Sequence, residues 1–170
     1  MTTLCELDQL LVICDSLCAE ELERIGRDLY RELYLPSGHY GVHQTHDGQI
    51  LMFHAETFDH AFYTTSDRIV YPERKDVLRK GSIERIRWIR PLVAGQVPRS
   101  ACFEVPSPTG RTRPPNRFYA IYATPYVVWL EPRRSGGWKF RTAYPTSIEE
   151  IHKYSRGGRT VWKWKEEKAP

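Results

Sequence analysis

The sequence predicts an α+β protein, in which N-terminal helices are followed by a mostly antiparallel, twisted β-sheet. In the first 36 residues, apolar side chains recur three and four positions apart, which is the spacing of a helix. After residue 40, short alternating segments are separated by Asp-Gly, Gly-Gly and proline-containing stretches, which is typical of strands joined by turns. Helices and strands do not alternate regularly along the chain, so a parallel βαβ sheet is not expected.

The chain has 170 residues, enough for one domain with a sizeable core. Within that single domain, 1–170, we expect a helical N-terminal region over 1–36 and a sheet-containing core over about 40–145. A C-terminal helix and tail are expected over 146–170.

The N-terminal region is predicted to form one bent helix or a pair of helices. Thr3 and Glu6 have the spacing of a capping box at its start. Pro36 and Gly38 are expected to end it. Two apolar stripes with helical spacing lie between these signals: Leu4, Leu7, Leu11, Cys14 and Cys18, then Leu22, Ile25, Leu29 and Leu33.

The next segments are predicted to be a hairpin and further helices. An Asp-Gly turn pair joins "GVHQT" to "QILMFH", which favours a hairpin. Residues 56–67, "ETFDHAFYTTSD", fit either a strand or a short helix. Residues 73–94 are predicted to be helical in two pieces separated at Gly81 and Ser82, with Ser82 as the N-cap of the second. Pro91 is expected to disturb that second piece.

The C-terminal half is predicted to supply most of the sheet. "ACFEV" fits a short strand, and 106–116, with four prolines, is expected to be a flexible connector. The segments "RFYAIYA", "PYVVWLE" and "WKFRTAY" alternate as strands, and Gly136 and Gly137 suit the turn between the last two. Thr146 and Glu149 have capping-box spacing before the helix "SIEEIHKY", and "TVWKWK" is the candidate for a last strand.

Composition favours a cytoplasmic protein without a metal or other cofactor. The chain is 41% hydrophobic and 27% charged, and no apolar run approaches the roughly 18 residues of a membrane helix. Acidic residues stand near the N-terminus, where a secretory signal would be basic. The sequence contains no CxxC pair that would suggest a zinc site. We expect the cysteines to be reduced and to act as small apolar residues. These are Cys5, Cys14, Cys18 and Cys102.

The charge is divided unevenly along the chain. Residues 1–84 hold 8 Lys+Arg and 15 Asp+Glu, whereas residues 85–170 hold 17 Lys+Arg and 6 Asp+Glu. Within 85–141 there are 11 cations and only two acids, Glu104 and Glu131. Such asymmetry predicts a polyanionic partner. The alternatives are a solvated basic face and internal pairing with the acidic half.

His54 and His60 are the candidates for acid/base chemistry. Phosphate-binding GxxxxGK[ST] and GxGxxG loops, a GxSxG elbow and an HExxH motif are all missing from the sequence, which excludes the commonest nucleotide-binding, hydrolase and zincin patterns. Imidazole titrates near neutral pH, so two histidines six positions apart suit proton transfer. They could equally be ordinary surface or hydrogen-bonded histidines. Asp59 could orient one of them or act as a cap, and no spacing enforces a metal site with Asp59 or His43.

Cations that could bind phosphate are interleaved with aromatic residues in the second half. The basic set is Arg85, Arg87, Arg90, Arg117, Arg133, Arg134, Lys139 and Arg141. In a regular strand over 138–144, one face would carry Trp138, Phe140, Thr142 and Tyr144. The other face would carry Lys139, Arg141 and Ala143, unless a bulge changes this partition.

The order "MFHAETFDHAFY", "ERIRWIRPLV", "RFYAIYATPYVVWL" and "WKFRTAYP" resembles the phage-associated branch of the barnase, EndoU, colicin and RelE superfamily of RNase toxins. In those domains a histidine-bearing segment precedes an "R-x-x-W-I"-like helix, and a late strand ends in a "T-A-Y"-like triplet. The match covers roughly residues 50–145. It implies a barnase/RelE/colicin-like sheet with helices on one face and an RNA cleft on the other.

The resemblance implies a metal-independent endoribonuclease, in which the ribose 2′-OH attacks the adjacent phosphate. His60 best matches the family histidine, with His54 second, while Thr142 and Tyr144 match the last strand. The phosphate cations would be drawn from Arg117, Arg85, Arg87, Arg90, Lys139 and Arg141. Because Thr142 and Arg141 lie on opposite faces of a regular strand, Arg117 and the 85–90 helix are favoured over Arg141.

The resemblance further implies RNA as the partner, with tRNA among the candidate targets, and an antitoxin or immunity protein that neutralises a toxin or prophage effector. Two other functions stay open. One is a nucleic-acid-binding module without catalysis, and the other is a phage-type interaction domain whose basic face meets an acidic protein. Cleavage of RNA in EDTA would separate the nuclease from both.

Overall fold

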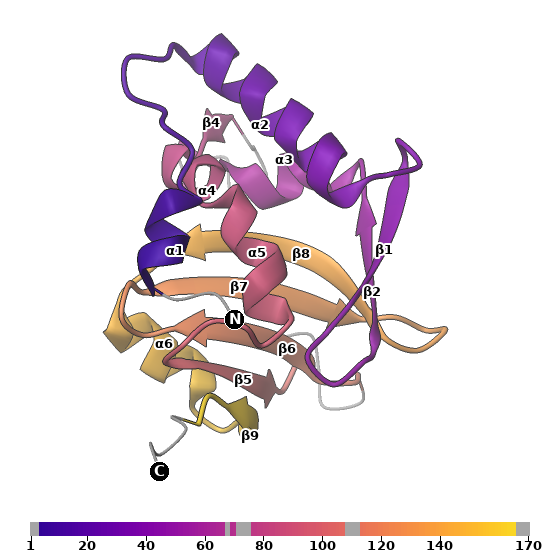
Figure 1. Ribbon diagram of the computed structural model, residues 1–170. Helices are drawn as coiled ribbons and strands as arrows, with labels where there is room; N and C mark the ends of the chain where they lie inside the picture. The colour runs from indigo at the N-terminus through magenta and orange to yellow at the C-terminus, as the bar shows by residue number, and fades with distance from the viewer. Residues whose placement is uncertain (1–3, 67–68, 71–75, 108–112, 166–170) are drawn as a thin grey trace.

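A computed structural model describes residues 4–66, 69–70, 76–107 and 113–165 (Figure 1). The helices are α1 (Leu4–Gln9), α2 (Ala19–Tyr34), α3 (Thr57–Phe62), α4 (Lys80–Glu84), the 3₁₀-helix η1 (Ile86–Trp88), α5 (Ile89–Val93) and α6 (Ile148–Ser155). The strands are β1 (Tyr40–Gln44), β2 (Ile50–His54), β3 (Tyr63–Thr64), β4 (Val77–Leu78), β5 (Ser100–Val105), β6 (Asn116–Ile121), β7 (Tyr126–Pro132), β8 (Trp138–Pro145) and β9 (Arg159–Lys163).

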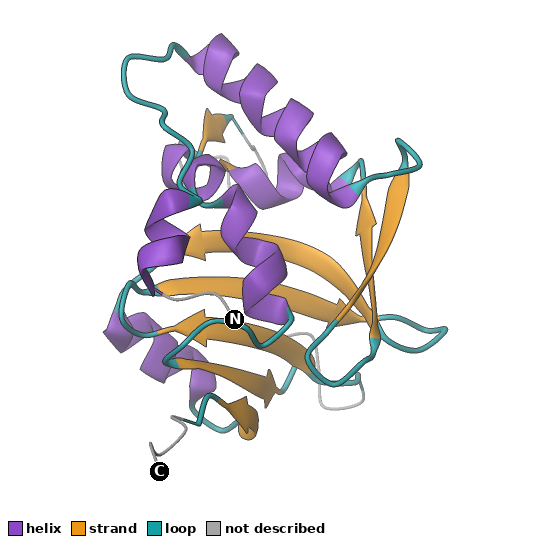
Figure 2. Cartoon of the chain, viewed as in Figure 1, coloured by secondary structure: helices purple, strands orange, loops and turns teal. Residues whose placement is uncertain are grey.

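A seven-stranded sheet in the order β1-β2-β8-β7-β6-β5-β9 organises the molecule (Figure 2). All neighbouring strands are antiparallel except β2 and β8, which run parallel and pair only over two residues of each strand. β3 and β4 form a separate two-stranded ribbon. The predicted α+β class with a mostly antiparallel sheet is therefore confirmed. Among the described residues, no helix is both long and apolar enough to cross a membrane.

Helices cover the two faces of the sheet unequally (Figure 1). The larger core lies between one face and helices α1 to α5, and Tyr30, Phe53 and Trp88 are among its buried aromatic side chains. A smaller core lies under α6 on the other face, where Ile151 packs with Phe118. The second face is thus not left bare, because α6 occupies one end of it.

The first predicted helix is much shorter than its apolar stripe suggests. α1 ends at Gln9, and Cys14 lies outside any helix. Cys18 precedes α2 as its N-cap. The intervening chain is bonded to the protein instead, since the backbone N–H of Val12 donates to the carbonyl of Glu84 at 2.9 Å. Tertiary hydrogen bonds have thus replaced the helical ones, while α2 and its end before Pro36 agree with the prediction. Thr3 lies outside the described residues.

The helical segment after β4 is divided at a different place from the predicted one. Gly81 and Ser82 lie inside α4, and Arg79 is the N-cap. Pro91 lies in the first turn of α5, where its missing N–H breaks no helical hydrogen bond. The division falls instead at Arg85, between α4 and η1. Residues 73–75 of the predicted helical range lie outside the described residues, and Val77–Leu78 within that range form β4, not a helix.

Most remaining element predictions are confirmed, with small shifts. The Asp-Gly hairpin is β1–β2, and "ACFEV" with the three later strand segments correspond to β5, β6, β7 and β8. The ambiguous stretch 56–67 divides into α3 and β3 within its described part. The cap of α6 is displaced by one residue, because Ser147, not Thr146, accepts a hydrogen bond from the N–H of Glu150 at 3.2 Å.

A bulge in β8 changes the predicted partition of its side chains. Leu130 of β7 is opposite Phe140, but the next β7 residue, Trp129, is opposite Thr142, so Arg141 is the extra residue. Beyond this point the strand reverses its alternation. Tyr144 consequently joins the core under α6, whereas Phe140 belongs to the larger core. The expectation that Thr142 and Tyr144 share a face with Phe140 is wrong for this reason.

Candidate functional site

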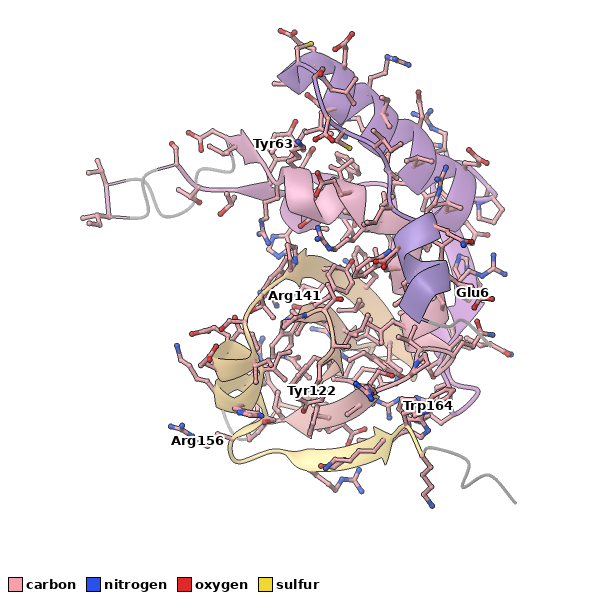
Figure 3. All side chains as sticks on the ribbon, turned by 60° about the vertical axis from the view of Figure 1, so that its left-hand side comes forward. Glu6, Tyr63, Tyr122, Arg141, Arg156 and Trp164 are labelled. Carbon is pink, nitrogen blue, oxygen red and sulfur yellow. The ribbon has the colours of Figure 1, made fainter. Side chains whose placement is uncertain are left out.

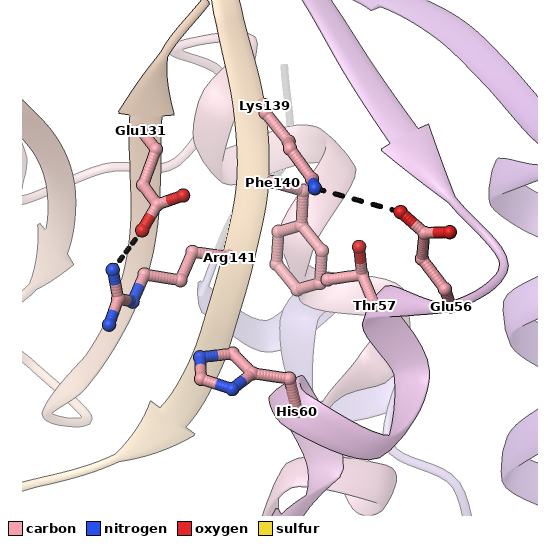
Figure 4. Close-up of a pocket in the computed structure, with 7 residues that line it drawn as sticks. All are labelled: Glu56, Thr57, His60, Glu131, Lys139, Phe140 and Arg141. Atoms are coloured by element: carbon pink, nitrogen blue, oxygen red, sulfur yellow. Dashed lines mark hydrogen bonds and ion pairs between the residues drawn. The ribbon is translucent and has the colours of Figure 1, made fainter.

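A cavity of about 270 Å³ lies between α3 and β8 (Figure 4). The side chain of His60 projects from α3 toward β8 in this cavity and is exposed to solvent. α3 reaches this place because it follows β2, whose pairing with β8 ends at Met52 and Lys139, and then packs along the rest of β8. The lining residues are Glu56, Thr57, His60, Glu131, Lys139, Phe140 and Arg141.

Two cations of β8, Lys139 and Arg141, line the same cavity as His60. Lys139 stands opposite Glu131 in the sheet, and Arg141 is the bulged residue that follows two positions later. The guanidinium of Arg141 is hydrogen-bonded to the Glu131 carboxylate. Lys139 Nζ lies 3.9 Å from the carboxylate of Glu56. These side chains are part-exposed, so the ion pairs can exchange for a bound anion at modest cost.

A basic groove of about 400 Å³ adjoins the His60 cavity and shares Glu131 and Arg141 with it. Arg113, Arg133 and Arg134 also line this groove, so its cations exceed its carboxylates. It lies beside the β7–β8 hairpin, at the start of β8. Because they share Glu131 and Arg141, the His60 cavity and the basic groove form one continuous surface. The His60 imidazole lies at one end of this surface and the guanidinium groups lie at the other.

Thr142 and Tyr144, predicted to be catalytic, have other partners. The hydroxyl of Thr142 donates to the carbonyl of Ala61 at 3.0 Å and so fastens the end of α3 to β8. The hydroxyl of Tyr144 accepts from the indole N–H of Trp129 at 3.2 Å. Tyr144 lines a different cavity, further along β8. Thr142 thus positions the His60 helix and is not itself among the residues that line the His60 cavity.

Arg117, the preferred phosphate cation, is in the interior with only 2% of its side chain exposed. Its Nη1 contacts both carboxylate oxygens of Asp47 at 3.0 Å, and its Nη2 donates to Glu104 at 2.8 Å. Its guanidinium lies 4.4 Å from the ring centre of Trp138. The assignment of Arg117 to phosphate binding is therefore wrong, because its side chain is buried and the carboxylates of Asp47 and Glu104 already hold it.

The two carboxylates around Arg117 have lowered pKa values. Burial raises the pKa of Asp47, but hydrogen bonds from Thr45 and Arg117 outweigh burial and leave the pKa below its ordinary value. Burial also raises the pKa of Glu104, and hydrogen bonds from Arg117 and Arg159 outweigh it in the same way. Both groups are therefore ionised near neutral pH, which fits a structural ion cluster.

The other cations predicted to bind phosphate and the second histidine do not line the His60 cavity. Arg85 donates to the Gly81 carbonyl at 3.1 Å, and Arg87 is half-buried in η1. Arg90 lines a cavity of about 310 Å³ between α5 and the β1–β2 hairpin. None of these three arginines lines the His60 cavity. His54 ends β2, and its carbonyl accepts from the Tyr30 hydroxyl at 3.0 Å.

The two carboxylates that line the His60 cavity were not among the candidates from the sequence. Glu56 pairs with Lys139, and Glu131 pairs with Arg141. The register counted outward from the Gly136–Gly137 turn places Glu131 opposite Lys139, so this carboxylate could have been found from the sequence. Asp59, considered as a partner for a histidine, instead pairs with Arg27 of α2 at 2.5 Å. No local signal in the sequence foretold that contact across 32 residues.

Comparison with known proteins leaves the resemblance to RNase toxins untested. Neither the protein-family models, nor the curated proteins, nor the solved structures gave a match to this chain. In the part of the chain that the structure describes, no group of three or more His, Cys, Asp or Glu side chains is arranged to hold a metal ion. The function is therefore inferred below from the geometry of the His60 cavity and the basic groove.

Proposed function

We propose that this protein is a metal-independent endoribonuclease whose active site is the His60 cavity. The observation that carries the proposal is the meeting of His60, Lys139 and Arg141 around one cavity that continues into an arginine-lined groove. An imidazole can transfer protons near neutral pH, and the cations can stabilise negative charge on phosphate oxygens. The groove supplies an electrostatic path for the RNA backbone.

The proposed reaction is an intramolecular transesterification at one phosphodiester of the RNA strand. The ribose 2′-oxygen attacks the adjacent phosphorus and loses its proton to a base, while the bond from phosphorus to the 5′-oxygen breaks and an acid protonates that oxygen. His60 takes one of these proton-transfer roles. A carboxylate, Glu131 or Glu56, takes the other. Lys139 and Arg141 stabilise the dianionic phosphorane by exchanging their carboxylate partners for phosphate oxygens.

The sequence resemblance supports the same function from a separate direction. His60 is the residue that best matches the family histidine, and the α+β fold with an antiparallel sheet agrees with the coarse architecture expected. We extend the proposal to a barnase-like scaffold, RNA as the substrate, and a neutralising protein that covers the basic groove. Thr142 and Tyr144 enter this scheme as residues that position α3 and β8.

Incubation of RNA with purified protein in EDTA tests the proposal. The wild-type protein and a His39→Ala control, which removes an exposed histidine that does not line the cavity, are expected to cleave RNA at equal rates. His60→Ala is expected to cleave at least about a hundredfold more slowly, the effect typical of a lost general acid or base. Intact RNA with the wild-type protein, or full activity in His60→Ala, would contradict the proposal.

RNA binding without cleavage is the second candidate, and one observation favours it. The arginines of the groove, Arg113, Arg133 and Arg134, extend beyond the cavity that holds His60, so affinity for RNA does not depend on the histidine. Salt-sensitive binding of intact RNA, equal in wild type and His60→Ala, would support this candidate over the nuclease.

A further inference from the structure

A second polar cavity, of about 500 Å³, lies further along β8 than the His60 cavity. It combines one cation, two tyrosines and a threonine, contributed by β3, the chain before α4, the end of β8, and α6. Figure 3 shows the flank of the molecule on which β8 passes between the helices. The residues that line this cavity are Thr64, Arg79, Gly81, Ser82, Tyr144, Pro145 and Tyr154.

The cation and the aromatic rings of this cavity are held in place by the protein. Arg79 is half-buried, donates from Nη2 to the Tyr63 carbonyl at 3.0 Å, and lies 5.2 Å from the ring centre of Tyr144. The Tyr144 hydroxyl also donates to the hydroxyl of Tyr154 at 3.4 Å. Burial, together with the Tyr144 contact, raises the pKa of Tyr154, so this phenol is neutral. Ser82 is fully buried and shapes the wall behind these groups.

The two cavities follow the same seam of the structure. Arg141 lines the first and Tyr144 the second, so they are three positions and roughly 10 Å apart along the strand. On the other side of the seam, α3 carries His60 and β3, which follows it directly, carries Thr64. The bond from Thr142 to Ala61 joins the two sides between the cavities. A single strand of nucleic acid lying along β8 would therefore meet both cavities in succession.

We propose that this second cavity, the Arg79 subsite, binds the nucleotide next to the one cleaved, on the side away from the arginine groove. The inference rests on the proposed endoribonuclease function and adds where the neighbouring nucleotide goes. Arg79 pairs with its phosphate or stacks on its base, since a guanidinium plane serves both purposes. The hydroxyls of Tyr154 and Thr64 offer hydrogen bonds to the sugar or base edge.

Binding of a length series of RNA analogues tests the Arg79 subsite without requiring cleavage. Fluorescein-labelled 2′-O-methyl oligonucleotides of increasing length are titrated by anisotropy against wild type, Arg79→Gln and a Lys80→Gln control. Lys80 is an exposed neighbour that pairs with Asp15 at 3.2 Å and does not line the cavity. We expect one added nucleotide to raise the affinity of the wild type and the control about tenfold. In Arg79→Gln that gain should fall to less than about twofold.

A photochemical measurement keeps the inference falsifiable if Arg79→Gln does not fold. An oligonucleotide with 5-iodouracil at the added position is irradiated with the wild-type protein, and the cross-linked peptide is identified by mass spectrometry. A cross-link to Tyr144 or Tyr154 is expected. Cross-links only to the segments that carry Arg113, Arg133 or Arg134 would overturn the subsite.

The outcomes separate this inference from the proposed function. RNA cleavage in EDTA together with a length gain that Arg79→Gln leaves unchanged would overturn the Arg79 subsite alone. A length gain that depends on Arg79 in a protein that does not cleave RNA would overturn the catalytic proposal alone. Failure of every oligonucleotide to bind the wild type would overturn both.

Discussion

Substitution of Arg117 by methionine should destabilise the protein strongly, because Arg117 is the centre of an ion cluster and not a phosphate ligand. Methionine keeps the length and apolar volume of the side chain but removes the guanidinium. The carboxylates of Asp47 and Glu104, whose side chains are 29% and 13% exposed, would then lose the cation that pairs with both. The contact of the guanidinium with the Trp138 ring would be lost as well.

The magnitude follows from what remains around each carboxylate. Removing one partner of a buried ion pair costs about 3–5 kcal/mol. Glu104 keeps its bond to Arg159 at 2.7 Å, and the Asp47 side chain is 29% exposed, so both retain some compensation. The lower end, about 3 kcal/mol, is therefore expected. With a urea dependence of about 2 kcal/mol/M, the unfolding midpoint would shift by roughly 1.5 M.

Urea unfolding followed by tryptophan fluorescence measures this shift. Arg134→Met is the control, since Arg134 is exposed at the hairpin and its loss should change the free energy of unfolding by less than about 0.5 kcal/mol. Arg117→Met combined with Asp47→Asn should recover part of the loss, because one unpaired charge is then removed. A loss below about 1 kcal/mol for Arg117→Met alone would refute this reasoning.

Three further expectations concern acid stability, salt and thiol reactivity. The lowered pKa values of the two carboxylates around Arg117 stabilise the fold above their unfolded values of about 4, so the free energy of unfolding should fall as pH drops below that point. An acid titration in urea that gave the same pH dependence for wild type and Arg117→Met would argue against this. Filter binding of single-stranded RNA at several salt concentrations gives the slope of log affinity against log salt. Arg134→Ala, which removes a cation of the basic groove, should reduce that slope by about 0.7. Arg24→Ala on α2 should leave the slope unchanged. Burial raises the pKa of the Cys102 thiol to about 12. A thiol reagent should therefore label exposed Cys18 in the native protein and Cys102 only after unfolding, as peptide mass mapping would show. Rapid labelling of Cys102 in the native protein would contradict its burial.

The fold was predictable where local signals and tertiary contacts agree. The Gly-Gly and Asp-Gly turns, the alternating segments that became β5 to β8, and the helical stripe of α2 all follow from local physics. The length of the first helix was not predictable, because the chain after it bonds elsewhere. Val12 bonds to Glu84, and Trp88 donates to the Leu7 carbonyl at 2.8 Å. Contacts across such long sequence separations outweigh a helical pattern and leave no local trace.

The site was predictable in part, because the sequence shows its cations but not their partners. His60, Lys139 and Arg141 were all candidates from the sequence, and they line one cavity. Regular alternation disfavours Arg141 because it opposes Arg141 to Thr142, but Thr142 bonds to Ala61 and does not line the cavity, so that objection does not apply. The sequence favours Arg117 as a phosphate ligand because it does not reveal which arginine is enclosed by acidic side chains. Its partners are 13 and 70 residues away along the chain.

The chemistry of the RNA product shows directly whether the His60 cavity is a ribonuclease site. A short RNA with one cleavable linkage is incubated with the wild-type protein in EDTA, beside the same RNA with a 2′-deoxy sugar at that linkage. We expect a 2′,3′-cyclic phosphate end from the first RNA, no cleavage of the second, and loss of the product in His60→Ala. Cleavage of the deoxy-substituted RNA, or a product that forms equally well in His60→Ala, would contradict the assignment of the His60 cavity as a ribonuclease site.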